Sequence, residues 1–490
     1  MAKRTFAYTL ASTAAVLLTS VAVSTLAPAQ TRGPTDPGVR GGAAGAGGEI
    51  PGLNTDQSKF FDAAKDAFEE VDVVADGLGP RFNLDSCVGC HSQPATGGSA
   101  PAINPQVDVA LAAKNTVPSF ISRNGPVREA RFVRNRDGSP DGGVHALFVI
   151  AGRGDAPGCN IRQPDFAGEL ARNNVVFRIP TPTFGLGLVE STTDRTLETS
   201  LAANSQQKSS LGVSGRFNRS GNDGTITRFG WKAQNKSLLL FAGEAYNVEV
   251  GVTNDLFPNE RENEPTCQFG HTHPESPTPL TPTELAATSQ AAGFQSDIVL
   301  FAAFMRLLAP PAPAGTTATA AASTTSTPAS TTATNASATS VLTSAAGTTS
   351  TAATSSTTST TATVDRGRTV FGNIGCSACH TRNLTSGPAD VAALGNKPFQ
   401  PYSDFAVHDM GDGLADGVSQ GGAGGREFRT APLWGVGKRV FFLHDGRTND
   451  LNVAIAQHSS RGSEANQVVQ NYNALPVSDR QAVLNFLRSL

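Results

Sequence analysis

The chain has 490 residues, which is long enough for two or more domains with hydrophobic cores of their own. Its 38 basic and 41 acidic residues give a net charge of −3, which argues against binding to nucleic acid or to an anionic membrane surface. Its 50 Gly and 30 Pro residues predict long irregular connections between the regular elements.

The N-terminal residues have the pattern of a secretory signal. Lys3 and Arg4 precede an apolar stretch, and an A-x-A cleavage site follows at residues 27–29. We therefore expect residues 1–29 to be a signal peptide and the mature protein to be periplasmic or otherwise exported. An uncleaved membrane anchor is the alternative.

Export has consequences for the rest of the chain. After signal cleavage we expect no stable membrane insertion, because no other segment approaches the ~20 apolar residues that span a bilayer. Residues 30–53 are rich in Gly and Pro and are expected to be disordered. An oxidising compartment would allow Cys159 and Cys267 to form a disulfide, which we favour over two free buried thiols.

The first folded part is expected to span residues 54–308. A helix that Asn54 or Thr55 can cap opens it, with Phe60, Phe61, Ala64 and Phe68 at helical spacing. A CxxCH motif follows at residues 87–91. Apolar runs at residues 146–150 and 175–179 indicate short strands or buried extended segments, and helices are expected near residues 237–248 and 296–308.

The composition then changes abruptly, because residues 309–363 are almost entirely Thr, Ala, Ser and Pro. This segment lacks the apolar mass that offsets ordering entropy, and it lacks the alternation of a Thr-rich β segment, so we expect a disordered linker without a catalytic role. Residues 364–490 form the second expected domain, with a helix from residue 364, a CxxCH motif at residues 376–380 and an amphipathic helix at residues 478–490.

The order of helix, CxxCH and amphipathic helix is typical of a cytochrome c domain. This order of elements is complete in residues 364–490. It is also present in residues 54–308, where a large extension follows the motif. The predicted fold class is therefore mainly α, with two cytochrome c-like domains, long loops and a few short strands.

The two CxxCH motifs indicate two covalently bound haem c groups. Two Cys sulfurs of a motif attach the haem and the adjacent His ligates its iron. If the motifs were redox CxxC pairs, a histidine would have to follow the second cysteine by chance in both of them. A zinc site would need its two Cys pairs close together in the sequence. The expected attachment residues are Cys87, Cys90, Cys376 and Cys379, and the expected iron ligands are His91 and His380.

His458 is the candidate for a second ligand to the C-terminal haem. It ends a predicted helix in which Leu451, Ile455 and His458 are spaced i, i+4 and i+7 and share the apolar face. A His on such a face is often a hydrogen-bonded core residue, but in a chain that must cap a haem, ligation becomes the favoured interpretation.

Five segments give the chain a resemblance to the di-haem oxidoreductase family. They are FNLDSCVGCHSQP at residues 82–94, RFGWKA at 228–233, HDMG at 408–411, RTAPLWG at 429–435 and LHDGR at 443–447. The family is distantly related to bacterial di-haem cytochrome c peroxidases, to the di-haem enzyme that matures methylamine dehydrogenase and to di-haem rubber oxygenases. The resemblance extends over about residues 55–308 and 364–490.

The resemblance bears on the iron ligands. In bacterial di-haem peroxidases an aromatic-His-x-Gly element precedes a helix, and a residue near the end of that helix, usually Met, caps the C-terminal haem. The matching element here is at residues 442–446, and the matching residue is His458. Since two imidazoles generally give a lower potential than His and Met, this departure puts a high-potential C-terminal haem in doubt. The resemblance makes His444 a structural residue in a turn.

Other side chains are weaker candidates. Trp231 is expected either to relay electrons between the haems or to be a buried anchor. Glu190 is a candidate acid/base for cleaving an O–O bond, with a solvated carboxylate as the alternative. His408 and Met410 are alternative haem ligands.

The favoured function is a peroxidase-like periplasmic redox enzyme. The N-terminal haem would be its open catalytic site and the C-terminal haem its electron-transfer site. A small electron-donor protein, such as a cytochrome or cupredoxin, and peroxide or dioxygen are the expected partners. One alternative is an enzyme that activates dioxygen or oxidises another substrate. The other is a non-enzymatic electron carrier with both haems six-coordinate.

Overall fold

The computed structural model describes residues 33–269, 278–279, 294–314 and 353–490. Helices hold 35% of the residues and strands 11%, which confirms that the fold is mainly α. The predicted signal peptide, residues 1–29, lies outside the described residues, as do residues 315–352 of the predicted linker. None of the described helices is both long and apolar enough to cross a membrane.

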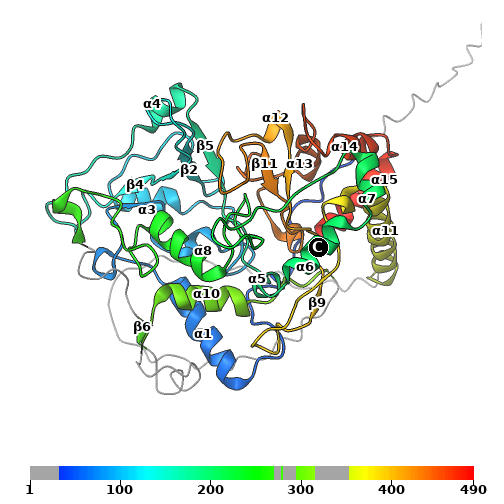
Figure 1. The fold of residues 1–490 in the computed structure, drawn as a ribbon, viewed down its shortest axis with the longest axis horizontal. Helices are drawn as coiled ribbons and strands as arrows, with labels where there is room; N and C mark the ends of the chain where they lie inside the picture. Colours follow the sequence, from blue (N-terminus) through cyan, green and yellow to red (C-terminus); the bar gives the residue numbers. More distant parts are fainter. Residues whose placement is uncertain (1–32, 270–277, 280–293, 315–352) are drawn as a thin grey trace, which may run out of the picture. The chain divides into compact units, whose positions relative to one another are not determined.

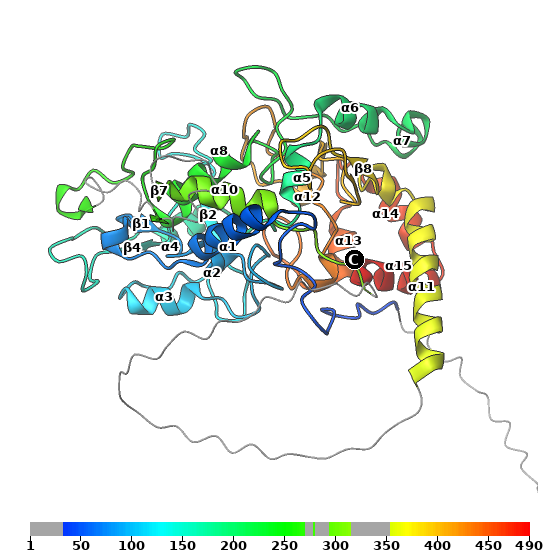
Figure 2. The same ribbon diagram turned by 90° about the horizontal axis from the view of Figure 1, so that it is seen from below.

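Two long helices form the framework of the N-terminal part. Helix α1 (Thr55–Glu69) begins at a capping box, in which Asn54 and Gln57 each bind the other's backbone N–H with the side chain. Its apolar face packs on α10 (Asp297–Leu307), where the rings of Phe61 and Phe68 lie 5.6 and 4.7 Å from that of Phe304. Figures 1 and 2 show α1, α10 and α8 side by side. The helices predicted at these positions are confirmed.

The other elements of the N-terminal part are short. Its helices are η1 (Val74–Asp76), α2 (Cys87–Cys90), α3 (Gln106–Ala112), α4 (Phe166–Ala171), α5 (Leu186–Glu190), α6 (Asp194–Ala202), α7 (Ser205–Leu211), α8 (Leu238–Ala245), the π-helix η2 (Tyr246–Val250) and η3 (Pro265–Cys267). Its antiparallel sheets are β1 (Arg81–Phe82) with β4 (Phe148–Val149), β3 (Val144–His145) with β2 (Glu129–Phe132) and β5 (Val175–Arg178), and β6 (Thr278–Pro279) with β7 (Phe294–Gln295). The predicted strands and the helix near 237–248 are confirmed, although that helix ends in a π turn.

The C-terminal part is organised around α11 (Ala353–Asn373) and α15 (Val477–Ser489), which pack together (Figures 1 and 2). A Cβ at Gly367 would collide with the backbone of Ala482, so glycine permits their close approach. The remaining elements are η5 (Cys376–Ala378), β8 (Leu384–Thr385), β9 (Pro398–Phe399), β10 (Val407–Asp409), α12 (Gly411–Leu414), β11 (Glu427–Arg429), η6 (Val436–Lys438), α13 (Leu451–Gln457) and α14 (Asn466–Asn473). Strand pairs β8–β9 and β10–β11 are antiparallel.

Helix α11 corrects one boundary of the predicted linker. It begins at Ala353, so residues 353–363 are helical although they were expected to be disordered. Alanine is the best helix former and Ser and Thr are only moderately unfavourable, so the segment can extend the packed helix that follows it.

The hydrophobic cores follow the two parts of the chain only broadly. Residues 34–490 form one compact unit. Its largest core combines residues of the N-terminal part with Leu384, Phe399, Phe405 and Trp434, whereas a second core consists of residues between 370 and 490. The division into domains at 54–308 and 364–490, and their cytochrome c-like character, remain predictions.

The segment before α1 is ordered where the structure describes it, which corrects the expectation of disorder for residues 33–53. Asp36 forms a buried ion pair with Arg488 of α15 (2.7 Å), and the Ile50 amide donates to the Leu307 carbonyl (2.6 Å). A Gly-rich segment has little core of its own, but these contacts with both parts of the chain hold it in place. The segment therefore links the N-terminal and C-terminal parts.

The two cysteines outside the CxxCH motifs form the disulfide that we favoured. Cys159 lies in the loop after β4 and Cys267 in η3, and both are buried. The bond ties two irregular segments that lack regular elements to hold them together.

Candidate haem sites

Two cavities lie within residues 34–490, and each contains one CxxCH motif. The cavity lined by Cys87, Cys90 and His91 is called the N-terminal cavity, and the one lined by Cys376, Cys379 and His380 the C-terminal cavity. Their atom-free spaces are about 1160 and 1600 Å³, including space that opens to solvent. Apolar side chains form most of the lining of each cavity around its motif.

The cysteines of both motifs are free thiols. In the N-terminal motif the Ser86 hydroxyl accepts a hydrogen bond from the Gly89 amide and caps α2, which carries both cysteines. Burial raises the pKa of the Cys87 thiol, and burial also raises that of Cys376, to about 12. The sulfurs of all four cysteines lie at the walls of the two cavities.

Three histidines share a hydrogen-bond pattern that suits metal ligation. In each, Nδ1 donates to a backbone carbonyl, which fixes the tautomer and leaves Nε2 with its lone pair. The pairs are His91 with Gly98 (2.9 Å), His380 with Tyr402 (3.0 Å) and His458 with Ala454 (2.8 Å). Burial lowers the pKa of each imidazole, so the rings are neutral at pH 7 and able to bind a cation.

His458 lies where the sequence predicted, at the end of the helix that follows the His444 turn. Asp450 caps α13 by accepting from the amides of Asn452 and Val453, and His458 is the C-cap residue and lines the C-terminal cavity with His380. Burial and, to a smaller extent, the nearby His458 together lower the pKa of His380 to about 4, so the two rings are neighbours.

The alternative ligand His408 is occupied by other partners. It lies on β10, and its Nε2 bonds Asp404 (3.1 Å) while its Nδ1 bonds Glu464 (2.9 Å). Burial tends to lower the pKa of His408, but the Cys379 sulfur and the Asp404 carboxylate raise it well above the usual range, which favours the imidazolium. A ring with protons on both nitrogens has no lone pair for a metal.

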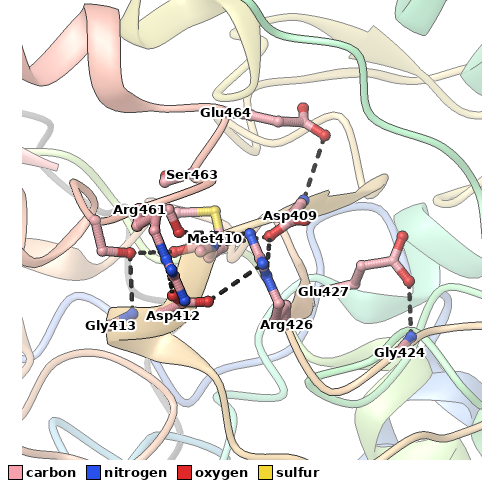
Figure 3. Close-up of polar contacts among 12 residues, drawn as sticks. Asp409, Met410, Asp412, Gly413, Gly424, Arg426, Glu427, Arg461, Ser463 and Glu464 are labelled. Carbon is pink, nitrogen blue, oxygen red and sulfur yellow. Dashed lines mark hydrogen bonds and ion pairs between the residues drawn. The ribbon is translucent and has the colours of Figure 1, made fainter.

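Met410, the other alternative, lines the C-terminal cavity from a segment that an ionic network fixes (Figure 3). Arg426 pairs with Asp409 (3.0 Å) and Asp412 (3.2 Å), and Arg461 pairs with Asp412 (2.7 Å). The Met410 amide also donates to the Arg426 carbonyl (2.9 Å). The network explains why the HDMG segment is rigid without requiring its Met to be a ligand.

The N-terminal cavity has a different set of side chains. Among the residues that the structure describes, His91 is the only histidine that lines it. Glu129 of β2 and Glu249 of η2 face it and hydrogen-bond to each other, and Arg131 pairs with Glu129 (2.6 Å). The Asn83 side chain donates to Glu249 (2.7 Å).

The two carboxyl groups differ in protonation. Burial and the charge of Glu129 raise the pKa of Glu249 well above its usual range. Burial alone would raise the pKa of Glu129 too, but Arg131 and the hydrogen bond with Glu249 lower it. The pair thus shares one proton, which Glu249 carries, and resembles the arrangement in which one of two adjacent carboxyls acts as acid and the other as base.

Neither member of this carboxyl pair was predicted from the sequence. Glu249 enters the cavity because α8 ends in the π-helix η2, which also places Tyr246 there. π-helical turns occur frequently at functional sites, but no sequence pattern predicted this one. A weaker signal was present for Glu129, since Glu129 and Arg131 alternate along a short strand and must share one face.

Glu190, the predicted acid/base, lies elsewhere. It lines neither cavity; its carboxylate pairs with Arg306 of α10 (2.5 Å) and accepts a hydrogen bond from the Leu238 amide (2.7 Å) at the start of α8. Glu190 therefore holds α5 to α8 and α10. Its acid/base role stays a prediction, whereas Glu129 and Glu249 do line the N-terminal cavity.

Trp231 lines both cavities, together with Ile179 and Pro180. Its indole N–H donates to the Ile179 carbonyl (2.8 Å), and its ring meets that of His444 edge-on with 6.3 Å between centroids. His444 also stacks on Phe428 (4.2 Å) and is held by the turn, as expected for a structural residue. The two interpretations of Trp231, relay and buried anchor, both fit this position.

The two cavities, each with a CxxCH motif and a locked histidine, define a protein that holds two redox cofactors of the haem type. Comparison with known families agrees. The chain matches the family described as "Di-haem oxidoreductase, putative peroxidase" over residues 132–351 and 314–490, and it belongs to this family. The match begins after the first CxxCH motif. No curated protein matches the chain.

The residues present fit a haem at each site. Each cavity supplies two thiols one helical turn apart, an imidazole with a free Nε2 and a largely apolar wall. In the C-terminal cavity His458 adds a second imidazole. No comparable second imidazole is present among the described residues of the N-terminal cavity.

Proposed function

We propose that the protein is an exported di-haem c-type oxidoreductase with peroxidase activity. Cys87 and Cys90 would bind one haem through thioether bonds, with His91 as its iron ligand. Cys376 and Cys379 would bind the other, with His380 and His458 as its ligands. The N-terminal haem would be the catalytic site and the C-terminal haem the site where electrons enter.

The difference between the two cavities carries this proposal. The C-terminal cavity has two neighbouring imidazoles with free Nε2 atoms, the ligand set of a six-coordinate haem that transfers electrons. The N-terminal cavity has one histidine and a carboxyl pair that shares a proton. Reduction of peroxide needs an open coordination position and a group that moves protons between its two oxygens, and the N-terminal cavity combines both.

A haem bound at His91 would supply the electron transfer that splits the O–O bond. The chain's own residues handle the protons. The Glu129 carboxylate would accept the proton of the peroxide oxygen nearest the iron, and protonated Glu249 would donate to the leaving oxygen, which departs as water. Arg131 keeps Glu129 ionised for the first of these steps.

Electrons would arrive one at a time from a small donor protein, such as a cytochrome or cupredoxin. They would enter at the C-terminal haem and cross to the N-terminal cavity through the wall that the cavities share. Trp231 is the aromatic side chain in that wall, so we propose it as the relay.

Two measurements on the oxidised full-length protein test the proposal. Electron paramagnetic resonance should show one high-spin and one low-spin haem, and peroxide should be consumed when a reduced small cytochrome is supplied. Two low-spin haems would favour an electron carrier instead. One high-spin haem with consumption of dioxygen but not of peroxide would favour the dioxygen-activating alternative.

A further inference from the structure

Two arginines that line the C-terminal cavity, Arg429 and Arg439, have no acidic partner among the residues that the structure describes. The Arg429 side chain is buried, with 6% of its surface exposed. Its Nε donates to the Gly230 carbonyl (2.9 Å), whereas its buried Nη1 has no hydrogen-bond partner. Arg439 uses Nη2 to donate to the Pro432 carbonyl (3.0 Å). Both guanidiniums therefore keep donors that the protein does not use.

No acidic side chain neutralises this pair. Glu464 is the one carboxylate among the described residues that line the cavity, and it is paired with the His408 imidazolium (2.9 Å). The other buried arginines pair with acidic side chains, as Arg178 does with Asp416 (2.7 Å). Arg429 departs from this pattern, and its partly exposed neighbour Arg439 has no ion pair among the described residues either.

The lack of a partner has a high energetic cost. Burial and the nearby charge of Arg439 together lower the pKa of Arg429 to about 10, and burial lowers the pKa of Arg439 to about 10. Both guanidiniums remain charged at neutral pH. Buried charges in proteins are usually paired or hydrogen-bonded, because an unpaired one loses its hydration without compensation. Two such charges beside one cavity point to a ligand that brings two negative charges.

We infer that Arg429 and Arg439 bind the two propionate carboxylates of the C-terminal haem. This rests on the proposed function, which puts a haem in this cavity, and it names the residues that fix the orientation of that haem. A haem carries both carboxylates on one edge, which matches two neighbouring guanidiniums in an otherwise apolar wall.

The inference also orients the haem within the protein. The Arg429 backbone amide donates to the Trp231 carbonyl (2.8 Å) and its side chain bonds Gly230, so Arg429 lies directly beside the shared wall. The propionate edge of the C-terminal haem would then face the wall that contains Trp231. This is the side from which electrons must leave for the N-terminal cavity.

Charge at this edge also affects the redox equilibrium. A nearby positive charge disfavours ferric iron relative to ferrous iron, so it raises the midpoint potential. Replacing either arginine with a neutral residue should therefore lower the potential of the C-terminal haem. It should also make this potential depend on pH, since an unpaired propionate takes up a proton more readily.

The test uses the full-length, haem-loaded protein with Arg429→Gln, Arg439→Gln and both together. Arg429→Lys keeps a cation, and Arg426→Gln is the matched control, because Arg426 is 40% exposed and already paired with Asp409 and Asp412 (Figure 3). The midpoint potential of each haem is measured by spectroscopic titration. Propionate hydrogen bonding is followed in the resonance Raman spectrum.

We expect each Gln variant to lower the potential of the low-spin haem and to shift its propionate bending bands. The double variant should show the largest change, Arg429→Lys an intermediate one and Arg426→Gln none. If both single variants contain two haems and their propionate bands are unchanged, the inference is overturned and the proposed function still stands. An equal shift of both haems would also overturn it, as a general loosening of the fold. Absence of haem from the unmodified protein would overturn both.

Discussion

The two cavities start from the same motif and end with different sets of charged side chains. Each begins with CxxCH and a histidine whose Nδ1 is bonded to a carbonyl. The N-terminal cavity then gains three carboxyl groups together with three arginines, whereas the C-terminal cavity gains a second available imidazole and two arginines without an ion pair among the described residues. The motif thus specifies how a haem would be held, and residues far from it specify what the haem could do.

The difference arises from the elements that close each cavity. A π-helix and a strand edge bring acidic residues to the N-terminal cavity, while the C-cap of α13 and the end of β11 bring His458 and Arg429 to the other. Proton transfer needs titratable groups beside an open iron, and electron transfer needs a closed coordination sphere. Substitutions at the side chains that distinguish the cavities therefore test this difference.

Removing the attachment cysteines should have the largest effect. Cys87→Ala with Cys90→Ala should halve the covalently bound haem, abolish peroxide reduction and keep the low-spin signal, because the C-terminal cavity is untouched. Cys376→Ala with Cys379→Ala should instead remove the low-spin signal. Haem staining of denatured protein on a gel measures the first result and electron paramagnetic resonance the second. Stain that acid-acetone extracts from the unmodified protein would refute covalent attachment.

Replacing either member of the carboxyl pair should have the second-largest effect, which is a loss of turnover. Glu249→Gln and Glu129→Gln should each lower the rate of peroxide reduction by about 10²–10⁴-fold, the usual contribution of general acid–base catalysis, without changing either haem spectrum. Because the pKa of Glu249 is raised, its proton is retained at neutral pH and lost as the pH rises through that value, so activity should fall on the alkaline side.

Glu244 provides the control for this prediction. It lines the same cavity but accepts a hydrogen bond from Asn235 and lies outside the pair. Steady-state rates over a range of pH should therefore be near normal for Glu244→Gln. Equal losses in all three variants would assign the effect to the general charge of the cavity and not to a shared proton.

His458 tests the other cavity. His458→Gly should turn the low-spin haem high-spin and leave the N-terminal haem as it was. His458→Met should raise the potential of the C-terminal haem, because a thioether favours ferrous iron more than imidazole does; axial ligands and surroundings tune haems over about 0.8 V. Met410→Leu, in the same cavity, should change neither property. A low-spin signal that survives His458→Gly would direct attention to Met410 and His444.

The parts of the fold and of the two sites that depend on nearby residues could be predicted from the sequence, because their local signals are strong. Helix α1 with its cap and the helix leading to His458 depend on residues a few positions apart, and they were predicted correctly. Trp231 was expected to be either a relay between the haems or a buried anchor, and it lines both cavities.

The rest depends on contacts between distant segments. Glu190 pairs with Arg306, and Glu129 meets Glu249, only through the fold. Residues 33–53 have the composition of a disordered segment, and only their contacts with both parts of the chain order them. Composition describes a segment in isolation and cannot include the partners that it finds.

Substitutions in residues 33–53 should have the smallest effect on the haem sites, because this segment links the two parts of the chain but lines neither cavity. Asp36→Asn would leave Arg488, only 5% exposed, without its partner, and breaking a buried ion pair costs about 3 kcal/mol or more. Burial tends to raise the pKa of Asp36, but Arg488 and backbone amides lower it overall. A carboxylate with a lowered pKa stabilises the fold above its unfolded pKa of about 3.9 and loses that effect as the pH falls through the folded value.

Thermal unfolding should therefore show a lower midpoint for Asp36→Asn at pH 7, and the difference should shrink below about pH 4. Hydrogen exchange should be faster at Arg40, whose amide donates to the Gly437 carbonyl (2.7 Å). Asp56→Asn is the control, since Asp56 is 62% exposed in a weak ion pair. Both haems should keep their spin states in both variants, because the contrast between the cavities depends on the side chains that line them. A change of spin state in Asp36→Asn would show instead that the segment shapes the cavities.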